Sequence, residues 1–222
     1  MQDALNGLVG AIKNDKGHFF VVDGNIYDSM IYVTRQFKDV IEFLTVLTEK
    51  KFPTFFHYDP FGGMKLIRGD ENQILQDMSL RQPTNSQDVS NDPAQQMITA
   101  LKKAKEKDSE SKFPLNPFEV FQCFDSFFEK SKQPSIVIMD YADLIPSSMK
   151  NNEQMFNIAW TKWARNKSIQ ENGHLIFLIC RRAANLDSSI LDRSFGVIQF
   201  WISKPDEGER YDEAQGEVPH VQ

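Results

Sequence analysis

Basic side chains and long apolar runs are scarce in this sequence, and each scarcity excludes a class of protein. The 222 residues carry 25 Lys and Arg against 31 Asp and Glu, a formal net charge of -6. Nonspecific binding of a polyanion needs clustered cations, so we do not expect nucleic acid as a partner. No apolar run approaches the roughly 20 residues of a membrane span, and the first residues lack the pattern of a signal peptide. We therefore expect a cytoplasmic protein with no membrane partner.

Cysteine is nearly absent too. Cys123 and Cys180 are the only two, and both lie in apolar segments without CxxC spacing or a paired His. This pattern indicates neither a zinc site nor a disulfide framework. We predict two buried, reduced thiols.

The chain also lacks the Gly-rich phosphate loop of sequence GxxxxGK[ST], known as Walker A. The nearest candidate is Gly62-Gly63-Met64-Lys65, which does not complete that frame. We predict a hairpin or bulge there, leading into an extended segment at residues 65–68. The standard phosphate loop is therefore excluded.

The stretch at residues 134–143 is the feature around which the chain is organised. Residues 136–139 are apolar on both faces, as in a central parallel strand with helices on either side. Asp140 then lies at the carboxyl end of the strand, where open α/β sheets bind ligands, and Asp143 follows three residues later. With 41% apolar residues, the chain can bury the core of one α/β domain.

Strands and helices alternate along the chain. Besides 136–140, strands are predicted at residues 18–22, 54–58, 174–180 and 197–202. Helices are predicted near the start, at 29–50 with Asp28 or Ser29 as N-cap, at 117–130 with Asn116 as N-cap, and at 153–169. This order predicts a mainly parallel five-stranded sheet in a three-layer α/β fold.

The first strand runs into Asp23-Gly24-Asn25. This sequence is either a hairpin turn or a loop at the ligand edge of a parallel sheet. The long helix predicted after it favours the loop.

Residues 70–112 differ in composition, because Gln, Asn, Asp, Ser and Lys dominate and aromatic residues are absent. We expect a polar, partly mobile insertion with one helix at 93–107. Its lysines can contact an acidic partner or nucleic acid, although such a run is more often a solvated face. Those lysines are Lys102, Lys103, Lys105 and Lys107.

The order of features in the second half of the chain resembles an AAA+ ATPase core, a RecA-like domain of the P-loop NTPase superfamily. Residues 136–140 lie where that family has its Walker B strand, and 174–180 resemble its sensor 1 strand. Residues 186–193 are similar to the segment that sends an arginine, here Arg193, to the neighbouring subunit. Residues 197–210 resemble the last strand and the start of the lid. The resemblance covers about a third of the chain.

The resemblance implies a RecA-like, AAA+-type domain over residues 1–210, with residues 70–112 as the insertion. Residues 211–222 would be a tail or the start of a missing lid. Trp201 and Tyr211 would be either interface anchors or core residues.

The chain departs from this family at the nucleotide site. Residues 23–28 replace the Gly-rich loop, and their two carboxylates would repel phosphates. Tyr141 follows Asp140, where the family has an Asp-Glu pair, and Asp143 lies beyond the strand. Asn185 can replace the polar sensor 1 residue. The remnant of a nucleotide pocket then consists of Asp23, Gly24, Asn25, Asp140, Asp143 and Asn185.

The chain is thus similar to the inactive amino-terminal modules of prokaryotic AAA+ proteins. That similarity implies a pseudoenzyme, a non-catalytic domain that acts in assembly or partner recognition. Its partners would be another protein or further AAA+ domains, in a ring or other oligomer within or beside a larger ATP-dependent remodelling machine.

Two alternatives stay open. In the first, ATP and Mg²⁺ bind at a non-standard phosphate site formed by Gly24, Asn25 and Asp140, and Arg193 reaches a neighbour's site.

In the second alternative, residues 19–25 resemble the first motif of PIN-type nucleases. Asp23, Asp59, Asp140 and Asp143 would then chelate divalent ions. Ordinary capping and turn formation by these acids is the favoured interpretation, and Arg181 stands where that family would need another acid.

Overall fold

The structure is a computed structural model that describes residues 1–80, 112–146, 153–192, 194 and 196–204. Its helices are α1 (Gln2–Lys13), α2 (Val40–Leu47), α3 (Glu71–Asp77), α5 (Pro117–Lys130), α6 (Glu153–Arg165) and α7 (Lys167–Glu171), with short 3-10 helices η1 (Ala142–Leu144) and η2 (Ala183–Asn185). Its strands are β1 (Phe19–Gly24), β2 (Met30–Tyr32), β3 (Arg35–Phe37), β4 (Thr54–Asp59), β5 (Gly63–Arg68), β6 (Ser135–Met139), β7 (Leu175–Cys180) and β8 (Val197–Ile202).

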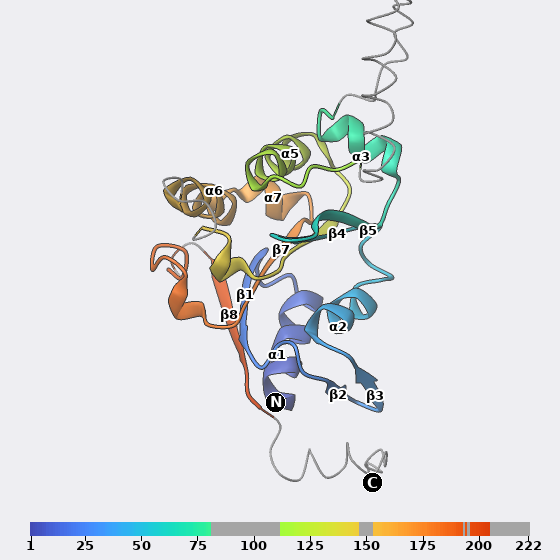
Figure 1. Ribbon diagram of the computed structural model, residues 1–222. Helices are drawn as coiled ribbons and strands as arrows, with labels where there is room; N and C mark the ends of the chain where they lie inside the picture. The colour runs from blue at the N-terminus through green and yellow to red at the C-terminus, as the bar shows by residue number, and fades with distance from the viewer. Residues whose placement is uncertain (81–111, 147–152, 193, 195, 205–222) are drawn as a thin grey trace, which may run out of the picture.

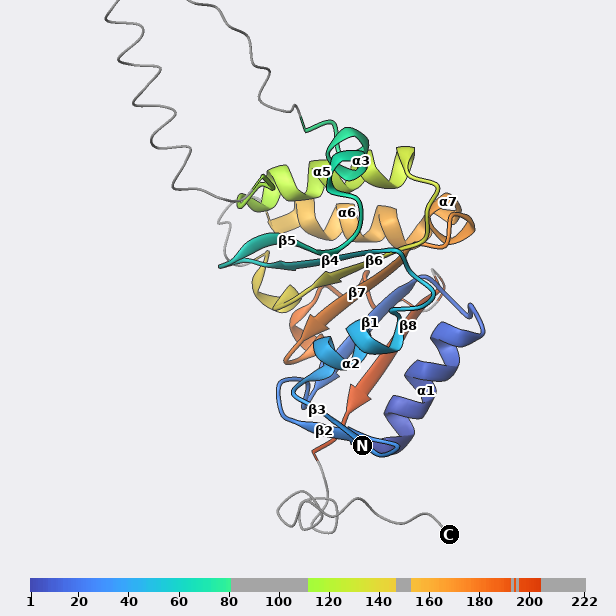
Figure 2. The same ribbon diagram turned by 90° about the vertical axis from the view of Figure 1, so that its right-hand side faces the viewer.

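The main sheet has six strands in the order β5-β4-β6-β7-β1-β8 (Figures 1 and 2). Neighbouring strands from β4 to β8 are all parallel, and β5 alone pairs antiparallel, through a hairpin with β4. The mainly parallel α/β architecture is therefore confirmed. The expected count of five strands is wrong by one, because residues 63–68 extend the sheet at its edge.

Helices cover the sheet on both faces (Figure 2). In β6, Val137 and Met139 pack in a core cluster with α3, α5, α6 and α7. Ile136 and Ile138 point the other way and pack with α1 and α2. Because successive side chains of a strand point to opposite faces, this alternation builds one core on each side of the sheet. The all-apolar run at residues 136–139 is thereby explained.

The predicted helix at residues 29–50 is wrong in its first half, residues 29–39. Met30 pairs with Phe37 in the antiparallel two-stranded sheet of β2 and β3, and α2 begins only at Val40. Its N-cap is Asp39, not Asp28 or Ser29. Residues 31–34 and 37 of the hairpin are β-branched or aromatic, which suits strands better than a helix.

The helices predicted at residues 117–130 and 153–169 are present, the second as two helices. Asn116 is confirmed as the N-cap of α5, and its side chain accepts a hydrogen bond from the N–H of Phe118. The predicted helix at 153–169 is divided, because Asn166 ends α6 and caps α7 by accepting from the N–H of Ser168. Cys123 and Cys180 are buried and unbridged, as predicted.

Several predictions fall outside the described residues. They concern the helix at 93–107 with its lysines, Arg193, Tyr211 and the segment at 211–222. In the part of the chain that is described, no helix has the length and apolar character needed to cross a membrane.

Candidate functional site at the carboxyl edge of the sheet

The residues expected to form a nucleotide-pocket remnant come from the ends of three strands. Asp23 and Gly24 end β1, Asp140 directly follows β6, and Asp143 lies in η1. Asn185 lies in η2, which follows β7. Because β6, β7 and β1 are neighbours in the sheet, the topology brings these side chains to one edge.

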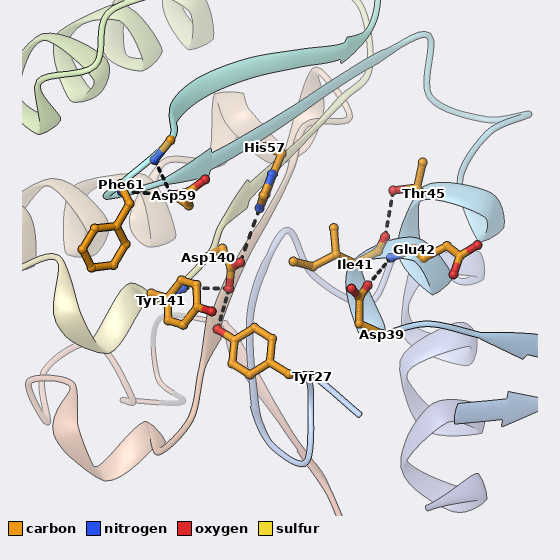
Figure 3. A network of polar contacts seen from close by, with 11 residues as sticks. Tyr27, Asp39, Ile41, Glu42, Thr45, His57, Asp59, Phe61, Asp140 and Tyr141 are labelled. Carbon is orange, nitrogen blue, oxygen red and sulfur yellow. Dashed lines mark hydrogen bonds and ion pairs between the residues drawn. The ribbon is translucent and has the colours of Figure 1, made fainter. Parts of the chain in front are cut away.

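Asp140 is the centre of a buried polar network (Figure 3). The residue is 5% exposed, and Oδ1 accepts hydrogen bonds from the hydroxyl of Tyr27 at 2.6 Å and from the N–H of Tyr141 at 2.8 Å. Oδ2 lies 3.5 Å from Nε2 of His57. Both carboxylate oxygens therefore already face protein groups.

The Tyr27 hydroxyl stays protonated in this network. Burial raises the pKa of Tyr27 far above its usual range, and the hydrogen bond to Asp140 raises it further. The phenol ring also stacks on Tyr141, with the ring centres 5.0 Å apart. Tyr27 is consequently a firm donor to Asp140.

Asp23 ties β1 to its surroundings. Its Oδ2 accepts a hydrogen bond from the N–H of Ala183 at 3.1 Å, and its Oδ1 accepts from the amide of Gln199 at 3.3 Å. The carboxylate thus caps η2 and reaches the edge strand β8. Its contacts are those of a structural residue.

Gly24 and Asn25 lie close against β8. Gly24 has a φ of 100°, and a Cβ there would come 2.4 Å from the carbonyl oxygen of Ile202. The N–H of Asn25 donates to that same carbonyl at 2.8 Å. Trp201, which is 65% exposed, lies over Gly24. The loop after β1 is therefore held against β8. Because β1 pairs with the parallel strands β7 and β8 on its two sides, the prediction of a loop rather than a hairpin turn is confirmed.

Asp143 and Asn185 form a second pair at this edge. The amide of Asn185 donates to Oδ2 of Asp143 at 3.3 Å, whereas Oδ1 of Asp143 is buried without a partner among the described residues. Burial, with Asp143 and Asp23 nearby, raises the pKa of Cys180 well above its usual range, so the thiol stays protonated and unreactive.

Asp59 has a different role. Its Oδ1 accepts hydrogen bonds from the N–H groups of Phe61 and Gly62, so it forms the tight turn between β4 and β5. Within the described residues, no three His, Cys, Asp or Glu side chains are grouped to hold a metal ion. The structure therefore does not bring the four carboxylates of the nuclease hypothesis into one chelating site.

The first turn of α2 carries acids and is already capped. The carboxylate of Asp39 accepts from the N–H of Glu42 at 2.8 Å, and the carbonyl of Ile26 accepts from the N–H of Val40 at 3.1 Å. The N–H of Lys38 in turn donates to Glu42. These contacts occupy N–H groups that a helix N-terminus would offer to an anion.

Sequence reasoning noted Tyr141 and Arg181 only as departures from family patterns, and it assigned no role to Tyr27 or Phe61. The ring of Tyr141 lies 6.4 Å from Phe61, and the guanidinium carbon of Arg181 lies 5.8 Å from the centre of the Tyr141 ring. The position of Tyr141 directly after Asp140 was an available signal, because a residue after a strand end lies at the ligand edge.

Comparison with known proteins gives a family. No curated protein matches this chain. Two solved structures are distantly similar: the cytoplasmic domain of EssC, with 12% identity and a TM-score of 0.35, and EssC (ATPases 2 and 3) from Geobacillus thermodenitrificans, with 14% and 0.37. Each match covers 93% of this chain but only 35% of the other, and the scores are too low to establish a shared fold. A family model matches residues 4–197, so the chain belongs to the family described as AAA+ chaperone, N-terminal Rossmann-like domain.

Proposed function

We propose that this domain is non-catalytic and acts in assembly or partner recognition, within or beside a larger ATP-dependent remodelling machine. The hydrogen bond between Tyr27 and Asp140 carries the proposal. Tyr27 belongs to the segment after β1, where AAA+ domains have their phosphate loop, and Asp140 takes the place of the acid that holds magnesium. The bond joins the two halves of the expected nucleotide site to each other.

The start of α2 supports the same conclusion. Phosphate binding at a helix N-terminus uses free N–H groups and a favourable dipole. Here Asp39 and the Ile26 carbonyl accept N–H groups of the first turn, and Glu42 adds a second carboxylate. Like charges repel at close range, so these side chains oppose a phosphate. The residues present therefore do not fit ATP with magnesium.

A domain that does not hydrolyse nucleotide can still contribute surfaces that bind other proteins. The family is defined as the N-terminal domain of an AAA+ chaperone, so hydrolysis would belong to another domain or another chain. This domain would then supply contacts, to a substrate protein or to the neighbouring modules of the machine.

Isothermal titration of the purified chain with ATP and ADP, with and without Mg²⁺, tests the proposal. We expect no saturable heat up to about 1 mM nucleotide. A Kd of about 1 mM corresponds to a binding free energy of about -4 kcal/mol. An AAA+ domain with an intact phosphate loop serves as the positive control in the same buffer. Micromolar, magnesium-dependent binding, or turnover by this chain, would remove the non-catalytic proposal.

A further inference from the structure

We propose that Phe61, Tyr141, Arg181 and Arg182 form a docking surface for an acidic segment of a partner protein, one that carries an apolar side chain beside its carboxylates. This set of four residues is called the edge surface below. The inference rests on the proposed function, because it gives partner recognition to a defined edge of the sheet.

Phe61 is the most exposed large apolar side chain of the edge surface. It is 85% exposed at the tip of the β4–β5 hairpin, where Asp59 accepts its N–H and that of Gly62. Leu115, 57% exposed, packs against Gly63 of the same hairpin. A large aromatic ring held outward on a fixed turn is typical of an interaction site, because leaving it in water costs free energy.

Tyr141 is held beside Phe61 by an unusual backbone. Its φ and ψ are 51° and 38°, the left-handed region, which costs a non-glycine residue on the order of 1 kcal/mol. The N–H bond to Asp140 and the stacking on Tyr27 keep it there. Such strain is most often retained where it places a side chain for function.

Two adjacent arginines supply the charge. Arg181 lies over the Tyr141 ring, Arg182 follows it, and both are exposed. Within the described residues, neither is ion-paired with a carboxylate. In a chain of net charge -6, unpaired neighbouring arginines at the ligand edge are complementary to an anionic partner.

Three acids near the carboxyl ends of the strands are buried, whereas both arginines are exposed. Asp23, Asp140 and Asp143 are each at most 8% exposed, and each accepts at least one hydrogen bond from the protein. A partner therefore meets the guanidinium groups and aromatic rings first. Arginine and aromatic side chains are the types that dominate binding energy at protein interfaces.

A protein partner fits this surface better than a nucleic acid. Two arginines are few for a polyanion, whose binding depends on neutralising many phosphates. The exposed side chains of Phe61 and Leu115 are also best buried against an apolar side chain of the partner. A carboxylate next to an aromatic or aliphatic residue supplies both contacts.

Fluorescence anisotropy on the full chain tests the inference with labelled synthetic peptides. The first probe alternates Asp or Glu with Leu and Phe. Matched probes carry Lys in place of the acids or Ser in place of the apolar residues, and labelled oligothymidylate represents nucleic acid. We expect binding of the first probe only, weakened by added salt because the contact is partly ionic.

Variants then locate the binding. Phe61→Ser, and Arg181→Glu combined with Arg182→Glu, should each lower the affinity at least about tenfold. The controls are Val33→Ser, which alters a residue 67% exposed on the β2–β3 hairpin, and Lys13→Glu combined with Lys16→Glu, which makes the same charge change elsewhere. They should bind as the parent chain does, and circular dichroism checks folding.

Three results would overturn the edge surface: no binding of the acidic probe, equal losses in the control variants, or preference for oligothymidylate. An ATP titration in parallel separates the two proposals. Nucleotide binding would contradict the proposed function, whereas failure of both ATP and peptide to bind would contradict the edge surface alone.

Discussion

The hydroxyl of Tyr27 lies 2.6 Å from Oδ1 of Asp140, across 113 positions of sequence. The contact ties the segment after β1 to the end of β6, and the stacking of Tyr27 on Tyr141 reinforces it. This segment cannot open around a phosphate without losing both contacts. One tyrosine and the acid it contacts thus join two segments at this edge of the sheet (Figure 3).

Replacement of Tyr27 by Phe removes that hydroxyl and keeps the ring. Asp140 is 5% exposed, so the loss leaves a buried carboxylate with one donor fewer. We expect the free energy of unfolding in urea to fall by about 1–3 kcal/mol. Tyr32→Phe is the control, since the Tyr32 hydroxyl makes no hydrogen bond within the described residues. Equal losses in both variants would contradict the role given to the Tyr27 hydroxyl.

Alanine substitutions at Gly24 and Gly10 should change the stability of the domain in opposite directions. Gly24 has a φ of 100°, and a Cβ would lie 2.4 Å from the Ile202 carbonyl, so Gly24→Ala should cost about 1–3 kcal/mol. Gly10 lies inside α1 with nothing within 4 Å of a Cβ, so Gly10→Ala should stabilise by about 0.5–1 kcal/mol. Thermal unfolding of both variants measures the difference. A stable Gly24→Ala variant would mean that the loop after β1 is not held against β8.

The sheet could be predicted because its strands are nearly continuous apolar runs. Residues 136–139 and 175–180 have no polar side chain, and only a strand covered on both faces explains that. Residues 29–39 were predicted wrongly, because the helical spacing of positions 37, 41, 44 and 47 was extended back to Ile31, which is six residues before Phe37 and does not share that helix face. The turn at Val33, with a φ of 59°, leaves no clear signal in the sequence.

The site was only partly predictable for a related reason. Asp23 and Asp140 could be placed, since each ends an apolar run and strand ends meet at one edge. The partners of these acids could not, because Tyr27 reaches Asp140 and Gln199 reaches Asp23 through contacts between distant segments. Local patterns carry no information on such contacts.

The cap of α2 gives another prediction. Asp39 accepts the N–H of Glu42 at 2.8 Å, and its removal leaves that N–H without a partner. We expect Asp39→Ala to lower the free energy of unfolding by about 1 kcal/mol. Asp39→Asn keeps an oxygen acceptor without the charge and should stay near the parent chain. A loss as large in Asp39→Asn would assign the stabilisation to charge and the helix dipole instead of the hydrogen bond.

His174 should make the domain less stable in acid. Burial lowers its pKa to about 4, and the ring is neutral: Nε2 donates to the carbonyl of Ser131 at 3.2 Å, and Nδ1 accepts from the hydroxyl of Ser135 at 2.8 Å. Because the unfolded chain takes up the proton near pH 6.5, the stability contributed by neutral His174 is complete above that pH. It should fall by about 3 kcal/mol as the pH drops to 4. In His174→Gln, urea unfolding should depend less on pH, with a remainder from buried His18, whose pKa is also lowered. An unchanged slope would show that His174 does not control the acid response.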